Sequence, residues 1–149
     1  MKYIMAFDPG DTTGWAAWDT EGNLQGMGQV TLEDMPTFLH KYDDLEISLV
    51  IVEDFILFAK RAVKQAGSRM KASQGIGMLH LWAAQKGAQF LKQPASIKNA
   101  AMKWSQISMP GAHSESHKFD AYLHGYYYLV THDLIKTQLQ LEIEAENHG

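Results

Sequence analysis

The sequence predicts an α/β fold in which a five-stranded mixed β-sheet is flanked by α-helices. Three short apolar segments, each closed by turn-forming residues, precede residue 33, and two more alternate with helical segments. That order of elements is typical of layered folds in which helices cover a sheet. The chain has 149 residues, of which 46% are hydrophobic and 20% charged, so we expect one globular domain over residues 1–149.

The strands are predicted where apolar runs meet residues that end a strand. Tyr3–Asp8 is followed by Pro9, which cannot donate to a strand ladder, and by Gly10, which favours a turn. The remaining strands are predicted, in chain order, at Gly14–Asp19, Leu24–Val30, Leu49–Val52 and Ala88–Gln93. The first three form an antiparallel meander, although two glycines, Gly26 and Gly28, weaken the third.

Helices are predicted at Glu33–Tyr42, Met70–Lys86, Ala95–Trp104 and His117–Thr131. The second ends before Gly87, a residue type common just beyond a helix C-terminus. Residues 60–71 contain Gly67, Ser68 and five basic side chains, and we expect a flexible loop there that can follow phosphate groups. Residues 133–149 form an acidic C-terminal tail in which neither helix nor strand is favoured.

Several classes of protein are excluded by composition. No apolar run is long enough to cross a bilayer, and the absence of cysteine excludes disulfides and thiolate zinc sites. The first apolar run reaches the charge of Asp8 too soon for a signal peptide. We therefore expect a cytoplasmic protein that does not bind membranes.

The distribution of charge is more informative than the net charge of −4, which taken alone argues against a nucleic-acid-binding protein. Residues 55–114 contain no acidic residue but hold nine of the thirteen basic ones. These nine are Lys60, Arg61, Lys64, Arg69, Lys71, Lys86, Lys92, Lys98 and Lys103. Such segregation favours a polyanionic partner, and the alternative is a solvated basic face.

A set of carboxylates stands at the ends of predicted elements. Asp8 ends the first strand, Glu53 ends the fourth, and Asp120 lies on the last predicted helix, three residues after His117 on the same face. Carboxylates gathered in one place repel unless a cation neutralises them, and oxygen ligands with one imidazole suit Mg²⁺ or Mn²⁺. The alternatives are an ordinary turn at Asp8, a solvated strand end at Glu53 and a packed or exposed histidine.

At this point the sequence resembles the RuvC-type Holliday junction resolvases of the ribonuclease H-like nuclease superfamily. The matching segments, in order, are residues 4–10 (IMAFDPG), 13–14 (TG), 50–53 (VIVE), 58–60 (FAK), 72–77 (ASQGIG), 94–98 (PASIK) and 117–121 (HKFDA). The resemblance implies a ribonuclease H-like fold with Asp8, Glu53, His117 and Asp120 as catalytic residues and metal ligands. It also implies two Mg²⁺ or Mn²⁺ ions per site, in a homodimer that cuts branched DNA at a four-way junction in the bacterial cytoplasm.

DNA contacts follow from the same interpretation. The residues expected to neutralise backbone phosphates are Lys60, Arg61, Lys64, Arg69, Lys71, Lys98, Lys103 and Lys118. Phe55 and Phe58 could stack on bases at the branch point or belong to the core. The segment between Lys98 and His117 is shorter than the family pattern, which is typical of divergent phage members with lower selectivity among branched DNAs.

The Met70–Lys86 helix is apolar nearly all round, which predicts burial on more than one side. One face can pack on the sheet and another on a second copy of the chain, with Gly77 permitting close approach. A two-fold dimer would match the near-symmetry of a four-way junction. The alternative is a helix enclosed within one subunit.

Three other functions stay open. The Asp8-Pro9-Gly10-Asp11-Thr12 pattern also begins actin-like ATPases and sugar kinases, but these need a second lobe for which 149 residues is too short. A non-catalytic binder of branched DNA would tolerate the loss of Glu53 or Asp120. A ribonuclease H-like enzyme would cleave RNA/DNA hybrids instead.

Overall fold

The computed structural model describes residues 1–55, 62–107 and 116–149, and for residues 62–69 it describes the backbone alone. Phe58, Lys60 and Arg61, which the sequence assigns to DNA binding, lie outside the described residues. Within the described part of the chain, none of the helices combines the length and the apolar character needed to cross a membrane.

Five strands form one mixed sheet, as predicted. They are β1 (Lys2–Asp8), β2 (Thr12–Asp19), β3 (Leu24–Thr31), β4 (Glu46–Glu53) and β5 (Gln89–Gln93). Their order across the sheet is β3-β2-β1-β4-β5. β2 pairs antiparallel with β1 and β3, whereas β4 pairs parallel with β1 and β5. The carboxyl ends of β1, β4 and β5 therefore meet at one edge.

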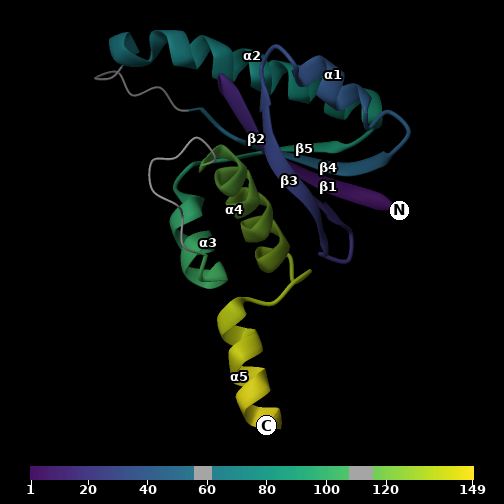
Figure 1. Ribbon diagram of the computed structural model, residues 1–149, viewed down its shortest axis with the longest axis vertical. Helices are drawn as coiled ribbons and strands as arrows, with labels where there is room; N and C mark the ends of the chain where they lie inside the picture. The colour runs from purple at the N-terminus through teal and green to yellow at the C-terminus, as the bar shows by residue number, and fades with distance from the viewer. Residues whose placement is uncertain (56–61, 108–115) are drawn as a thin grey trace.

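Helices cover both faces of this sheet (Figure 1). On one face Met5, Phe7, Val50 and Val52 pack with α1 (Met35–His40) and α2 (Ala62–Lys86). On the other face the alternate residues of the same strands, Ile4, Ala6, Leu49 and Ile51, pack with α4 (Ser116–Thr131). This two-residue alternation decides which strand residues face α4. α3 (Ile97–Ser105) packs on α4 through Ala101, Leu123 and Tyr126.

Two glycines allow helix α4 to lie close to β2. Gly14 of β2 lies against the backbone of α4, and Gly125 of α4 lies against a side chain of β2. A Cβ atom at Gly14 of β2 would lie 1.8 Å from the carbonyl oxygen of His117. A Cβ atom at Gly125 of α4 would lie 2.2 Å from the indole ring of Trp18. Side chains at these positions would push the helix away, so the glycines set the height of α4 above the sheet.

The structure corrects one sequence prediction and decides the conformation of a segment that the sequence leaves open. The flexible loop predicted over residues 60–71 is wrong from residue 62 onward, because α2 begins at Ala62 rather than Met70. Gly67 and Ser68 do not interrupt it, since one glycine costs only about 1 kcal/mol amid good helix formers. The acidic tail, for which neither state was favoured, contains α5 (Gln138–His148), which begins with a capping box between Thr137 and Gln140. Figure 1 shows α5 extending away from the sheet.

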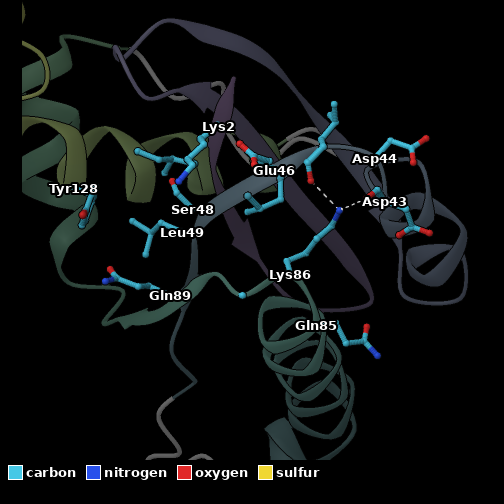
Figure 2. A pocket seen from close by; sticks show the side chains of 14 residues that line it. Lys2, Asp43, Asp44, Glu46, Ser48, Leu49, Gln85, Lys86, Gln89 and Tyr128 are labelled. Carbon is cyan, nitrogen blue, oxygen red and sulfur yellow. Dashed lines mark hydrogen bonds between the residues drawn. The ribbon is translucent and has the colours of Figure 1, made fainter.

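The amino end of β4 is tied to the C-terminus of α2. The Lys86 ammonium donates hydrogen bonds to the backbone carbonyls of Tyr42, Asp43 and Leu45 in the α1–β4 loop. Figure 2 shows this lysine beside an open, highly charged pocket. The pocket lies at the edge of the sheet opposite to the carboxyl ends of β1 and β4.

Candidate metal centre

Three polar side chains stand in a row where the parallel strands end. Glu53 is paired with Gln93 across β4 and β5, and Asp8 follows Phe7, the residue that pairs with Val52 on β4. Side chains two residues apart on a strand point to the same face of the sheet. The face that carries Ala6, Ile51 and Leu91 is covered by α4. The same face therefore carries Asp8, Glu53 and Gln93. The strand order thus brings Asp8 and Glu53 to adjacent positions, as the sequence predicts for parallel neighbours.

Helix α4 places a second row of polar groups above the first. His117, Asp120 and His124 are spaced by three and four residues, so they lie on one helical face. His117 Nδ1 lies 3.1 Å from Asp8 Oδ2. One ligand atom from each of Asp8, His117 and Asp120 lies within 4.8 Å of the others. Three of the four predicted ligands therefore converge on one point.

Glu53, the fourth predicted ligand, joins this group through hydrogen bonds. Its carboxyl group lies close enough to Asp8 that each of the two groups shifts the pKa of the other. Its Oε2 atom accepts from the Lys98 ammonium at 3.2 Å and from His124 Nε2 at 3.1 Å. All four predicted ligands thus belong to one connected cluster.

Lys98 lies inside the carboxylate cluster rather than on an outer DNA-facing surface. Its ammonium is 3.2 Å from Glu53 and 3.5 Å from Asp120 Oδ1, and its side chain is only 21% exposed. α3 begins at Ile97, so Lys98 stands on the first turn of the helix that follows β5. The sequence predicted a phosphate contact for this lysine, and the structure gives it carboxylate partners.

The electrostatics of the cluster favour a bound cation. Burial and the charges of Glu53 and Asp120 raise the pKa of Asp8 from 3.8 to about 7, although the hydrogen bond with His117 opposes the rise. Burial also acts to raise the pKa of Glu53, but the His124 hydrogen bond and the Lys98 charge lower it to about 2. The hydrogen bond with Asp8 raises the pKa of His117. Burial therefore disfavours the ionised form of Asp8 even with His117 beside it.

A divalent cation fits this donor set. Carboxylate oxygens with one imidazole nitrogen are ligands that Mg²⁺ and Mn²⁺ accept. The raised pKa of Asp8 marks a site where a further negative charge is poorly balanced by the protein alone. Asp8, Glu53, His117 and Asp120 together could hold such an ion, and replacement of the Asp8 proton by metal would balance the charge.

Those of the remaining predicted DNA-binding residues that the structure describes lie around this edge of the sheet or on the helices beside it. Gly75 of α2 packs against Pro9, so α2 passes beside the turn that follows Asp8. Lys71 on α2 pairs with Asp11 of that turn. Lys103 is exposed on α3 and Phe55 is half-buried after β4. The Lys118 backbone N–H donates to Gln29 Oε1 at 3.3 Å.

Two residues of the cluster, His124 and Gln93, are absent from the sequence-based prediction. His124 is completely buried and its Nδ1 lies 2.9 Å from Gln93 Oε1. A signal for His124 existed, because it follows Asp120 by one helical turn. Gln93 carried no comparable signal, since its role depends on the pairing of β5 with β4.

Neither a protein-family model nor a curated protein matches the sequence. Solved structures do match. RuvC from T. thermophilus in complex with a Holliday junction substrate has a TM-score of 0.67 and 13% identity, covering 92% of this chain and 99% of that one. A second Thermus thermophilus RuvC structure has a TM-score of 0.62 and 13% identity, covering 91% and 99%. The chain therefore has the ribonuclease H-like fold of RuvC over nearly its whole length, in a strongly diverged sequence.

Proposed function

We propose that this protein is a metal-dependent endodeoxyribonuclease that nicks four-way and related branched DNA. The observation that carries the proposal is the convergence of Asp8, His117 and Asp120, joined by Glu53, at the carboxyl ends of β1 and β4. The likeness in fold to RuvC, which has been solved with a Holliday junction, supports branched DNA as the substrate class.

The four residues would hold two Mg²⁺ or Mn²⁺ ions, with Asp8 as the shared ligand. When bound, such ions activate a water molecule and stabilise the leaving oxygen of a phosphodiester. Asp8 must be ionised and His117 neutral before they can serve as ligands, so we expect metal binding to release protons and to strengthen as pH rises. In-line attack by water would leave a 5′-phosphate and a 3′-hydroxyl.

Lys98 would serve this reaction after the site is loaded. Its ammonium balances Glu53 and Asp120 in the metal-free state. Once cations neutralise those carboxylates, the flexible lysine stem could turn toward a phosphate of the substrate. There a positive charge stabilises the negative charge that develops in the transition state.

DNA would lie across the basic residues beside this edge. Lys64, Arg69 and Lys71 belong to the amino-terminal part of α2, which is helical rather than a flexible loop. Together with Lys60, Arg61, Lys103 and Lys118 they would contact phosphates and make binding sensitive to salt. Phe55 and Phe58 would stack on bases at the branch point.

A homodimer through α2 completes the proposal, because two nicks across a junction need two sites. Leu81 and Met70 on α2 are 61% and 64% exposed. Of the described atoms outside α2's own backbone, none lies within 4 Å of a Cβ built at Gly77, which leaves room for a second helix. Sedimentation should give a dimer for the natural chain and a monomer for Leu81→Glu.

A comparison of substrates tests the activity. The natural chain and the inactive variant Asp8→Asn are each incubated with Mg²⁺ or Mn²⁺ and one of four substrates. The substrates are a four-way junction, a flap, a linear duplex and an RNA/DNA hybrid. We expect junction nicking by the natural chain, and junction binding without nicking by Asp8→Asn. Asp44→Asn is the matched control, since Asp44 is exposed beside the pocket at the opposite edge of the sheet. Undiminished cleavage by Asp8→Asn would overturn the metal site.

The same experiment separates the alternatives. Preferred cleavage of the hybrid would identify a ribonuclease H-like enzyme. Junction binding that is unaffected in Glu53→Gln, with no cleavage by the natural chain under either metal, would identify a non-catalytic binder.

A further inference from the structure

We propose that His124 and Gln93 form a positioning pair that fixes the carboxylate of Glu53 for cation binding, an inference that rests on the proposed function. His124 is fully buried between α4 and the sheet. Its two ring nitrogens contact two neighbouring strands, Nε2 with Glu53 of β4 at 3.1 Å and Nδ1 with Gln93 of β5 at 2.9 Å.

The position of His124 is one that a hydrophobic residue would ordinarily fill. Its neighbours on the inner face of α4, Ala121, Leu123 and Leu129, are all buried and apolar. A buried imidazole is costly unless both nitrogens are paired. The fold does not require a polar group here, so the specific partners of His124 point to a role at Glu53.

The chemistry of each partner defines the direction of the contacts. His124 Nε2 lies 3.1 Å from Glu53 Oε2, and a carboxylate oxygen accepts hydrogen bonds, so the geometry assigns the donor to His124 Nε2–H. The Gln93 amide offers both an acceptor and a donor, so it can orient His124 through Nδ1. Gln93 is itself 6% exposed and in register with Glu53. Hydrogen bonds through His124 of α4 therefore link Gln93 of β5 to Glu53 of β4 and restrict the orientation of all three side chains.

His124 and Lys98 contact the same oxygen of Glu53 but differ in freedom. Lys98 has an ammonium on a flexible stem that is partly exposed, so it can leave when a cation arrives. His124 is enclosed on all sides and stays in place. It would therefore hold Oε2 in the loaded site as well and leave Oε1 available to a cation. Outer partners of this kind commonly change metal affinity by about 10–100-fold.

Substitutions at His124 test the pair through Mn²⁺ binding, measured by electron paramagnetic resonance of the free ion. His124→Leu should lower Mn²⁺ affinity by about 10–100-fold and lower nicking in parallel. His124→Gln keeps an N–H group within reach of Glu53 and should restore most of the affinity. Gln93→Leu, which frees the ring of His124, should give an intermediate loss. Leu129→Val is the control, because it alters packing on the same helix without contacting Glu53.

The metal-free protein supplies a readout that does not depend on activity. The ¹³C resonance of the Glu53 side-chain carboxylate should shift in His124→Leu and return toward its natural position in His124→Gln. An unchanged resonance, or equal Mn²⁺ affinity in folded His124→Leu and the natural chain, would overturn the pair. If the natural chain neither binds Mn²⁺ nor cuts DNA, the proposed function fails instead, and the resonance still decides whether His124 orients Glu53.

Discussion

Removal of the Asp8 carboxylate should stabilise the metal-free protein above neutral pH while it abolishes cleavage. Asp8 is largely buried and lies beside Glu53 and Asp120. Its pKa is about 7 in the folded protein against 3.8 ordinarily, so the folded state disfavours its ionised form. Asp8→Asn keeps the shape of the side chain and can no longer ionise.

The magnitude follows from the linkage between proton binding and stability. Between about pH 4 and pH 7 the folded state binds a proton at Asp8 that the unfolded chain has lost, so stability falls as pH rises through this window. Each pKa unit corresponds to about 1.4 kcal/mol. The free energy of unfolding should therefore drop by about 2–3 kcal/mol between pH 5 and pH 8 through Asp8 alone.

His117 acts in the same direction. Its pKa is raised by the hydrogen bond with Asp8, so the stability that it contributes is complete below about pH 6.5 and is lost as pH rises through its folded pKa. Asp8→Asn removes the partner that causes this shift. Glu53 does not contribute to the slope, since its lowered pKa stabilises the protein equally at pH 5 and pH 8.

Urea unfolding in EDTA at pH 5, 6, 7 and 8, followed by tryptophan fluorescence, measures the effect. The natural chain should lose about 2–3 kcal/mol across this range, and Asp8→Asn should be nearly flat and more stable than the natural chain at pH 8. Mg²⁺ at pH 8 should raise the stability of the natural chain alone. Parallel pH profiles for the two proteins, or a less stable Asp8→Asn at pH 8, would refute the reasoning. Asp44→Asn should follow the natural profile.

Three further outcomes are expected elsewhere in the molecule. Lys86→Met should lower the free energy of unfolding by about 1–3 kcal/mol, since three loop carbonyls lose their donor, while Mn²⁺ affinity stays unchanged; an unaltered urea midpoint would contradict this. Gly125→Ala should lower the free energy of unfolding by about 1–3 kcal/mol through collision with Trp18, and an unchanged urea midpoint would count against the packing argument. Junction affinity should fall steeply with salt concentration, and Lys103→Ala should reduce the slope of log affinity against log salt by about one; a flat salt response would remove the phosphate contacts.

The sequence determined the elements of the sheet and the acids that stand at their ends. The apolar runs Tyr3–Asp8 and Leu49–Val52 predict two buried strands, and Asp8 and Glu53 follow directly from where those strands stop. The spacing of His117 and Asp120 placed both on one helical face. These are local properties, since they depend on residues a few positions apart. The sequence predicts the start of α2 at Met70 rather than Ala62, because Gly67 and Ser68 are weaker helix formers than the residues around them.

The tertiary structure alone decided how the cluster is neutralised and held. Lys98, His124 and Gln93 meet Glu53 only because β4 lies between β1 and β5 and α4 crosses above them. A single sequence does not specify strand order, and the partner of a buried polar group is chosen by which elements pack together. Lys98 therefore pairs with carboxylates, and His124 is buried with both ring nitrogens bonded. Both outcomes depend on contacts between residues far apart in the sequence, because a buried polar group needs a partner and only the packing of the elements supplies it.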